Sequence, residues 1–390
     1  MIARYDFIVI GGGIAGVSAA YELAAHGSVC LLEQEQQLAY HTTGRSAAIS
    51  MESYGNQQIR SLTCASRGFF ENPPEGLAEH PLWAPRGALI VAQAARVDKL
   101  KARFSAVLGQ VPTAELLDAK QVLELVPYLA EGAWSAGIYE PSAFDLDVHG
   151  IHGAYLGGLR ARGGVIKRET QVLRGEYRTG HWCLHTQDGQ QLQAATVVNA
   201  AGAWADEVAE RCGVPKVGVR PLRRTVLAVD PQCDVHHTPY LGTVDEDIFI
   251  KPEAGRLIVS PCDESPSLPC DALPEELDLA ITMDRLQNTT RLRPRSIINK
   301  WAGLRTFVAD RSPVLGQDPQ QESFIWLAAL GGYGIQAAPA IARLCSHAAL
   351  GIAMPDDLAA LQLNYQHFSP ARCRDEEFSS LAVKQVADLH

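Results

Sequence analysis

The stretch Tyr5–Glu33, YDFIVIGGGIAGVSAAYELAAHGSVCLLE, decides the fold of the first part of the chain. It opens on an apolar, β-branched run typical of a strand buried on both faces. Gly11, Gly13 and Gly16 follow at once with GxGxxG spacing, and then come a helical pattern, a second apolar strand and an acid, Glu33. This order predicts a Rossmann-like unit that binds a dinucleotide.

Each of these residues has a physical task in such a unit. Gly11 allows the tight turn, Gly13 lets the backbone approach a pyrophosphate, and Gly16 lets helix and strand pack closely. Glu33 is placed to accept hydrogen bonds from ribose hydroxyls. The unit binds NAD or FAD equally well, but the sequence has no second GxGxxG and no CxxxxC pair, which disfavours a pyridine-nucleotide-driven disulfide reductase.

Two later segments predict further walls of the same cofactor site. They are residues 196–205, TVVNAAGAWA, and residues 324–344, FIWLAALGGYGIQAAPAIARL. In both, small residues end a buried strand and begin a helix, which brings backbone N–H groups and the positive end of a helix dipole against a ligand.

Composition limits the class of protein. With 390 residues, 47% hydrophobic and 20% charged, the chain can bury a large core or two coupled ones. A net charge of −10 disfavours a nucleic-acid partner. Nine scattered cysteines without a CxxC pair predict reduced thiols and no metal site. No stretch is long and apolar enough for a transmembrane segment, so we expect a cytoplasmic protein, or one peripheral at the inner membrane.

The motifs together resemble a known family. VIGGGIAG, Glu33, HTTGRSAA (residues 41–48), VVNAAGAWAD, WAGLRTFVADRSPVLG and LGGYGIQ are similar to those of the FAD-dependent D-amino acid oxidase and dehydrogenase superfamily, which includes glycine oxidase and sarcosine oxidase. The resemblance covers nearly the whole chain, and it looks closest to the bacterial D-arginine dehydrogenase branch.

The resemblance implies an α/β fold with two domains. A discontinuous, Rossmann-like FAD-binding domain would comprise residues 1–85, 140–215 and 310–390, and an inserted α+β substrate domain with an antiparallel sheet would comprise residues 86–139 and 216–309. The residues agree with this, because residues 216–300 lose the alternation of strand and helix and contain extended segments such as TVLAVD, DIFIKP and RLIVSP.

The resemblance also implies an FAD cofactor and the residues that contact it. Some relatives attach flavin to a cysteine just after the arginine-bearing strand, but here Thr306, Phe307 and Val308 stand there, so we predict noncovalent FAD. Arg45 has two open roles, bracing its loop or touching phosphate. The expected cofactor contacts are Gly11, Gly13, Ala15, Gly16, Glu33, Gln34, Thr42, Thr43, Gly44, Arg45, Ser46, Ala47, Ala48, Val172, Ala201, Gly202, Trp204, Arg305, Gly331, Gly332, Tyr333, Gly334, Ile335 and Gln336.

Enzymes of this class transfer a hydride from the substrate Cα to flavin N5, and they must hold the substrate carboxylate rigidly. A planar cation with two donors does this best, and Arg305 matches the arginine that binds the carboxylate in the family. Arg223 matches a second arginine, although strand alternation allows only one of Arg223 and Arg224 to face the pocket. Tyr54 and Tyr333 are the aromatic candidates, and no general base stands out.

Three departures from the D-arginine dehydrogenase branch concern the substrate pocket. The branch has an acid on the strand expected at residues 86–91 that pairs with the cationic end of the substrate, whereas residues 86–89 here, RGAL, include none, and Ala88 is the expected pocket residue. Ile49 replaces a histidine, and Phe249 replaces a tyrosine. Burying a guanidinium without a partner costs about 3 kcal/mol or more. We therefore expect a small or apolar side chain, rather than that of D-arginine, in a pocket that Gly332 also lines.

These inferences predict FAD-dependent oxidative deamination of a D-amino acid, giving an imino acid that hydrolyses to a 2-oxo acid and ammonia. The family branch favours a dehydrogenase, with a quinone, another acceptor or oxygen receiving the electrons. One alternative is a flavin-dependent enzyme for glycine, sarcosine or a 2-hydroxy acid. Another is a non-catalytic flavoprotein subunit, against which Arg305 counts. The oligomeric state stays open.

Overall fold

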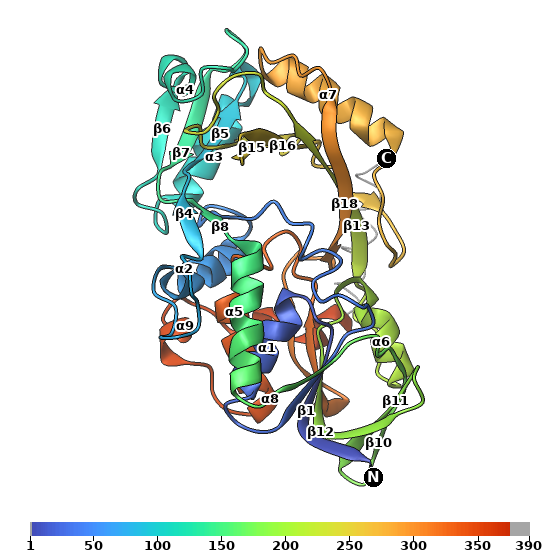
Figure 1. The fold of residues 1–390 in the computed structure, drawn as a ribbon. Coiled ribbons are helices and arrows are strands. Elements are labelled where there is room, and N and C mark those ends of the chain that lie inside the picture. Colours follow the sequence, from blue (N-terminus) through green and yellow to red (C-terminus); the bar gives the residue numbers. More distant parts are fainter. Residues whose placement is uncertain (1, 375–390) are drawn as a thin grey trace.

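Two large sheets organise the protein, one in the lower and one in the upper half of Figure 1. The computed structural model describes residues 2–374, so residues 375–390 of the predicted cofactor domain lie outside the described residues. The lower sheet uses strands within residues 3–32, 165–199 and 314–328, and the upper sheet uses strands within residues 88–140 and 220–307. The predicted fold class is confirmed, while the predicted domain boundaries stay a prediction.

The lower sheet is built around β1 (Ala3–Ile10), which pairs in parallel with β2 and β12. Phe7 and Val9 of β1 belong to one hydrophobic core, and Ile8 and Ile10 belong to the core on the other face. The strand is thus buried on both faces, as its apolar run predicts. Its partners are β2 (Val29–Leu32), β9 (Val165–Lys167), β10 (Val172–Arg178), β11 (His181–Thr186), β12 (Gln191–Asn199), β19 (Val314–Asp318) and β20 (Gln321–Ala328).

Three helices cover one face of this sheet. They are α1 (Ile14–Leu23), α5 (Val148–Ala161) and α8 (Ala338–Leu350), and α1 packs between the other two (Figure 1). A Cβ on Gly158 of α5 would come within 2.6 Å of the Tyr21 ring on α1, so the close approach of these helices needs a glycine. On the other face lies α6 (Ala205–Arg211) beside β10.

The upper sheet is mainly antiparallel, with one parallel pair between β5 and β14. Its two longest strands, β13 and β18, extend down toward the lower sheet in Figure 1. The strands are β5 (Ala88–Ala92), β6 (Glu115–Asp118), β7 (Ala136–Glu140), β13 (Arg220–Val229), β14 (Tyr240–Thr243), β15 (Phe249–Glu253), β16 (Arg256–Ser260), β17 (Ser265–Pro266) and β18 (Ile297–Phe307). The helices around it are α3 (Val97–Val107), α4 (Ala119–Leu125) and α7 (Glu276–Thr289).

A small third sheet consists of β3 (Ile49–Ser50), β4 (Trp83–Pro85) and β8 (Phe144–Leu146), and α2 (Gln57–Glu71) begins shortly after β3. Among residues 2–374, the last helix of regular α geometry is α9 (Asp356–Ala359). Within residues 2–374, no helix is both long and apolar enough to cross a membrane.

The lower core should be sensitive to the loss of volume. Leu31 on β2 has no solvent exposure, so Leu31→Ala is expected to lower the free energy of unfolding by about 2–5 kcal/mol. The matched control is Leu268→Ala, because Leu268 is 82% exposed and its loss should change stability by less than about 0.5 kcal/mol. Urea unfolding followed by circular dichroism measures both, and equal effects would contradict this assignment of the core.

Candidate flavin and substrate site

The glycine turn after β1 forms the floor of a large cavity between the two sheets. Gly11 has φ +115°, and a Cβ there would lie 2.4 Å from the carbonyl oxygen of Ala200. A Cβ on Gly16 would lie 1.8 Å from the carbonyl oxygen of Gly11. Gly11 lines the cavity, whereas Gly16 does not and serves only the close packing of the turn.

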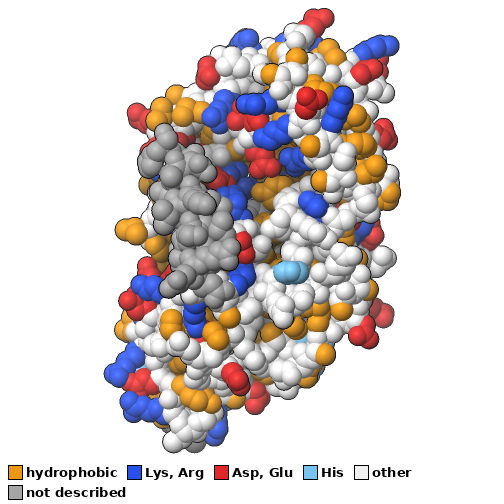
Figure 2. All heavy atoms as spheres, turned by 180° about the vertical axis from the view of Figure 1, so that it is seen from behind, with side chains coloured by type: hydrophobic (Ala, Val, Ile, Leu, Met, Phe, Trp, Pro, Cys, Tyr) orange, Lys and Arg blue, Asp and Glu red, His pale blue; other side chains and the backbone are white. Residues whose placement is uncertain are grey.

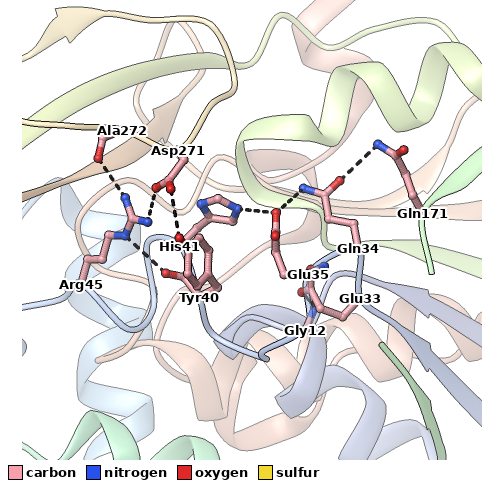
Figure 3. Close-up of polar contacts among 10 residues, drawn as sticks. All are labelled: Gly12, Glu33, Gln34, Glu35, Tyr40, His41, Arg45, Gln171, Asp271 and Ala272. Atoms are coloured by element: carbon pink, nitrogen blue, oxygen red, sulfur yellow. Dashed lines mark hydrogen bonds and ion pairs between the residues drawn. The ribbon is translucent and has the colours of Figure 1, made fainter. Parts of the chain in front are cut away.

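Glu33 directly follows β2 and is hydrogen-bonded to the same turn. Its two carboxylate oxygens accept hydrogen bonds from the backbone N–H of Gly12 at 2.7 Å and of Glu35 at 2.9 Å (Figure 3). Burial raises the pKa of Glu33, while these hydrogen bonds favour the ionised form. Glu33 lines the cavity, and each carboxylate oxygen has a second lone pair that could accept from a ribose hydroxyl.

The end of the cavity beside Glu33 is polar and partly aromatic. Gln171 donates to Gln34 at 3.4 Å, and a His41 nitrogen lies 2.9 Å from Glu35 (Figure 3). The His41 ring also packs against Trp204, with 4.6 Å between the ring centres. These groups fit the nucleotide end of a dinucleotide, which offers flat rings and hydroxyls.

The helix that follows the turn presents its N-terminus to the cavity. Its N-cap residue, Gly13, has no side chain to cap the helix, and Thr43 Oγ1 accepts from the N–H of Ile14 at 3.0 Å. Other N–H groups of the first turn remain for a ligand, and the helix dipole favours an anion there. The residues present therefore fit a pyrophosphate.

Residues 41–48 run between this helix and the upper sheet. Thr42 Oγ1 donates to the carbonyl of Leu304 at 2.7 Å. Arg45 turns away from the cavity, donates to the carbonyls of Ala272 and Ala302, and pairs with Asp271 (Figure 3). Arg45 therefore braces its loop, which is one of its two predicted roles, and the prediction that it contacts the cofactor is wrong. Gly44 does not line the cavity either.

The third wall is the loop between β20 and α8. Gly331 has φ +49°, and a Cβ on Gly332 would lie 2.6 Å from Cζ of Arg305, so the guanidinium packs directly on the loop backbone. Tyr333 does not line the cavity, because its hydroxyl donates to the carbonyls of Ala329 and Arg311, both at 3.1 Å. The predicted catalytic and cofactor role of Tyr333 is therefore wrong.

The cavity brings most of the predicted cofactor residues together. Those that line it are Gly11, Gly13, Ala15, Glu33, Gln34, Thr42, Thr43, Ser46, Ala47, Ala48, Val172, Ala201, Gly202, Trp204, Arg305, Gly331, Gly332, Gly334, Ile335 and Gln336. Gly12, His41 and Gln171 line it too and were missed by sequence reasoning.

The second arginine of the site is Arg224, and the prediction for Arg223 is wrong. In the β13–β18 ladder Leu222 lies opposite Arg305, so Arg224, two residues further on, projects from the same face as Arg305. Arg223 projects from the other face and pairs with Asp278 at 2.9 Å and with Glu275. Burial and the nearby Arg305 lower the pKa of Arg224.

Arg305 and Arg224 differ in how they are held. Arg224 donates to the carbonyl of Asp263 at 2.8 Å and pairs with Glu264 at 3.2 Å. The Arg305 guanidinium lines the cavity and forms no hydrogen bond or ion pair with another described residue. A cation in such a place calls for an anionic ligand.

The walls around the two arginines are mostly apolar. Ile49, Phe249 and Tyr54 line the cavity as predicted. Ala88 does not, because it packs in a cluster behind Ile90 and Tyr240, which reach the cavity instead. Sequence reasoning also missed Met51, Arg103, Gly242, Thr243, Glu246, Ile248 and Cys262. Arg224 alone could have been found from the sequence. Pairing its strand with the strand of Arg305 and applying the alternation of side chains puts both arginines on one face.

The glycine turn should tolerate no side chain at its first position. Gly11→Ala adds a Cβ at a positive φ and against a carbonyl, which costs about 3 kcal/mol. We expect loss of bound flavin, measured as absorbance at the flavin band per folded chain. Gly109→Ala is the control, since a Cβ there meets nothing within 4 Å. If Gly11→Ala kept the flavin content of the wild type, the assignment of the glycine turn to the flavin site would be wrong.

Comparison with known proteins identifies the family. A family model described as FAD dependent oxidoreductase (DAO) matches residues 6–348. Mitochondrial dimethylglycine dehydrogenase of Mus musculus is 25% identical over 386 residues, covering 93% of this chain and 44% of that protein, so the chain spans less than half of that relative.

Two solved structures share the fold. Glycine oxidase from Geobacillus kaustophilus has a TM-score of 0.81 at 21% identity, covering 93% of this chain and 99% of that one. L-alpha-glycerophosphate oxidase from Mycoplasma pneumoniae, with FAD bound, has a TM-score of 0.82 at 17% identity, covering 90% and 95%. The predicted FAD cofactor is thus confirmed, and the chain belongs to the DAO family of FAD dependent oxidoreductases.

Proposed function

We propose that this flavoenzyme oxidises a small amine that carries a carboxylate, with a D-amino acid as the leading substrate class. The observation that carries the proposal is the Arg305 guanidinium, which lines the cavity beside Arg224 on the same sheet face and forms no hydrogen bond or ion pair with a described protein anion. A carboxylate would supply the missing negative charge and could accept two parallel hydrogen bonds.

The placement of Arg305 also supports chemistry at the neighbouring carbon. Its guanidinium lies on the backbone of Gly332 in the loop that forms the third wall of the flavin site. A substrate held by its carboxylate at Arg305 would keep its Cα close to that wall, which reduces the entropy cost of reaching the reactive arrangement. FAD, when bound, would accept the hydride that leaves Cα, and the resulting imino acid would hydrolyse to a 2-oxo acid and ammonia.

The histidines support an amine over a 2-hydroxy acid as substrate. Oxidation of an alcohol needs a base to remove its proton, for which histidine is the usual residue. Among the described residues, His41 is the one histidine in the lining, and it lies beside Glu35 at the nucleotide end. His152 instead has its Nε2 3.0 Å from the carbonyl of Gly12 beneath the turn. An amine can bind neutral and needs no such base.

The apolar walls support a small or apolar side chain. Ile49, Ile90 and Phe249 offer nothing to pair with a guanidinium, and Glu246 in the same lining is already paired with Arg103. D-Arginine is therefore disfavoured even though the motifs look closest to the D-arginine dehydrogenase branch. Dehydrogenase rather than oxidase activity, and a cytoplasmic or peripheral location, remain part of the proposal. Glycine and sarcosine are the alternative substrates that the same carboxylate site would accept.

An anaerobic panel of amino acids tests the function. The purified holoenzyme should lose its yellow colour with apolar D-amino acids and keep it with D-arginine. Glycine, sarcosine and a 2-hydroxy acid in the same panel separate the alternatives. Bleaching by none of these compounds would favour a non-catalytic flavoprotein subunit.

Replacing Arg305 should weaken substrate binding far more than flavin binding. Arg305→Met removes the carboxylate partner, so we expect kcat/KM to fall by on the order of a hundredfold, about 3 kcal/mol, with unchanged flavin content. Arg223→Met is the matched control, because it breaks ion pairs outside the cavity and should lower Tm without raising KM. Equal losses of flavin and activity in Arg305→Met would mean that Arg305 is structural.

The flavin should be noncovalent. The positions after Arg305 are Thr306, Phe307 and Val308, and none of them can form a thioether. We expect acid precipitation of the holoenzyme to leave all FAD in the supernatant, measured by its absorbance and mass. A yellow pellet would contradict this.

A further inference from the structure

The outer wall of the substrate cavity carries an ion pair between two separate elements. Arg103 comes from α3, and Glu246 comes from the loop between β14 and β15, and both side chains line the cavity. Arg103 Nη1 lies 3.4 Å from Glu246 Oε1. The Arg103 side chain is 18% exposed and that of Glu246 is 60% exposed, so the pair reaches from the cavity to solvent. Figure 2 shows this hollow between the two halves, with Lys and Arg side chains around it.

The loop that carries Glu246 is held in one conformation from both sides. Its neighbour Asp245 pairs with Arg96 at 2.9 Å and with Lys99 at 2.7 Å. Lys99 and Arg103 are four residues apart and therefore share one face of α3. On the other side, Arg285 donates to the carbonyl of Asp247 at 2.5 Å.

The backbone of Glu246 itself is unusual. It has φ +56°, a conformation that costs a non-glycine residue about 1 kcal/mol and persists only where the surroundings impose it. The N–H of Glu246 donates to the carbonyl of Thr243 at 3.0 Å, which closes the turn. The carboxylate is thus presented to Arg103 by a fixed loop.

The lining of the cavity combines three kinds of group. Arg305 and Arg224 are cationic, Ile90 and Phe249 are apolar, and the Arg103–Glu246 pair reaches solvent. The Tyr240 ring stacks on Phe249, and the strand that Tyr240 begins, β14, leads to the loop of Glu246. A side chain that extends from a carboxylate at Arg305 would end at the Arg103–Glu246 pair.

We propose that the Arg103–Glu246 pair is a charge filter that selects substrates whose side chain ends uncharged. This inference rests on the proposed carboxylate site at Arg305. A terminal ammonium would be attracted by Glu246 but repelled by Arg103, and a terminal carboxylate would meet the reverse. The two effects nearly cancel, while the desolvation of the entering charge remains, so either charge is rejected. Removing one partner exposes the other to the cavity and admits the opposite charge.

Three probes that share a five-carbon chain test the filter without depending on turnover. Pentanoate, glutarate and 5-aminopentanoate each offer one carboxylate to Arg305 and differ only in an apolar, anionic or cationic far end. Each is titrated into the holoenzyme, and the flavin spectrum gives its Kd. The wild type should bind pentanoate most tightly.

The two single variants should change this preference in opposite directions. In Glu246→Gln, we expect glutarate to gain about tenfold in affinity relative to pentanoate. In Arg103→Met, 5-aminopentanoate should gain by a similar factor. The double variant should again prefer pentanoate, because neither charge remains.

The matched controls remove the same charges from an exposed ion pair elsewhere on the surface. Lys120→Met and Glu124→Gln should leave the relative affinities within about twofold of the wild type, since neither residue lines the cavity and their side chains are 85% and 64% exposed. Equal shifts in controls and filter variants would overturn the proposal, as would a wild type that binds all three probes equally. No spectral change with any probe would overturn both the carboxylate site and the filter, whereas binding with unchanged ratios in the variants would overturn the filter alone.

Discussion

The hydrogen bonds of β18 hold the two halves of the active cavity in one geometry. This strand pairs with β13 along nearly its full length in the upper sheet. At its lower end, the carbonyl of Leu304 accepts from Thr42, and the carbonyl of Thr306 accepts from the N–H of Gly331 at 2.8 Å.

The residues of β18 that make these contacts flank Arg305. One side of the strand thus touches the loop of residues 41–48, and its end touches the glycine loop before α8. Both loops are walls of the flavin site. The arginine that would bind the substrate is therefore placed relative to the cofactor by backbone hydrogen bonds, which long side chains alone could not do as rigidly.

Three arginines lie in the same region, and only two of them, Arg224 and Arg311, are paired with a carboxylate of the described chain. Glu264 receives two hydrogen bonds from Arg311, at 2.7 and 3.0 Å, and one from Arg224 at 3.2 Å. These arginines lower the pKa of Glu264 despite its burial, so the carboxylate stays ionised. Arg311 also lies over the Phe307 ring at 3.9 Å. Arg305 is left outside this network, which makes it the cation with the most to gain from an added anion.

How far the sequence predicts the structure depends on the range of the interaction. The glycine turn and Glu33 are local features of one strand–helix–strand unit, and their placement follows from spacing alone. Arg223 and Arg224 could not be distinguished in this way, because the choice depends on which residue lies opposite Arg305 in a strand some eighty positions later in the chain. The observed register of β13 and β18 shows that Arg224 shares the face of Arg305.

The outer wall of the cavity could not be predicted from the sequence at all. Arg103 and Glu246 are separated by more than a hundred residues and carry no motif, and Tyr240 looks like any aromatic residue before a strand. The positive φ of Glu246 gives no signal either, since glycine would be the expected residue there. Ile49 and Phe249, which replace polar residues of the D-arginine dehydrogenase branch, line the cavity as predicted. They gave no indication of the Arg103–Glu246 pair in the same lining.

Two buried polar side chains, Gln336 in the cavity wall and Glu140 behind it, hold the segment that leads to the substrate zone. Gln336 ends the third wall, accepts from the N–H of Met51 at 3.1 Å and donates to Thr63 at 3.0 Å. Glu140 accepts from the N–H of Glu52 at 2.7 Å and of Ser53 at 3.3 Å, although burial raises its pKa.

The segment held by these two side chains leads directly to Tyr54, which faces the substrate zone. Its backbone has no regular secondary structure of its own, so its N–H groups would otherwise be unsatisfied in a buried place. A buried carboxylate is an expensive way to satisfy them, and its use here is explained if the position of Tyr54 relative to Arg305 matters for substrate binding. Part of the cost of burying charge in this protein thus falls on a residue, Glu140, that positions the substrate site.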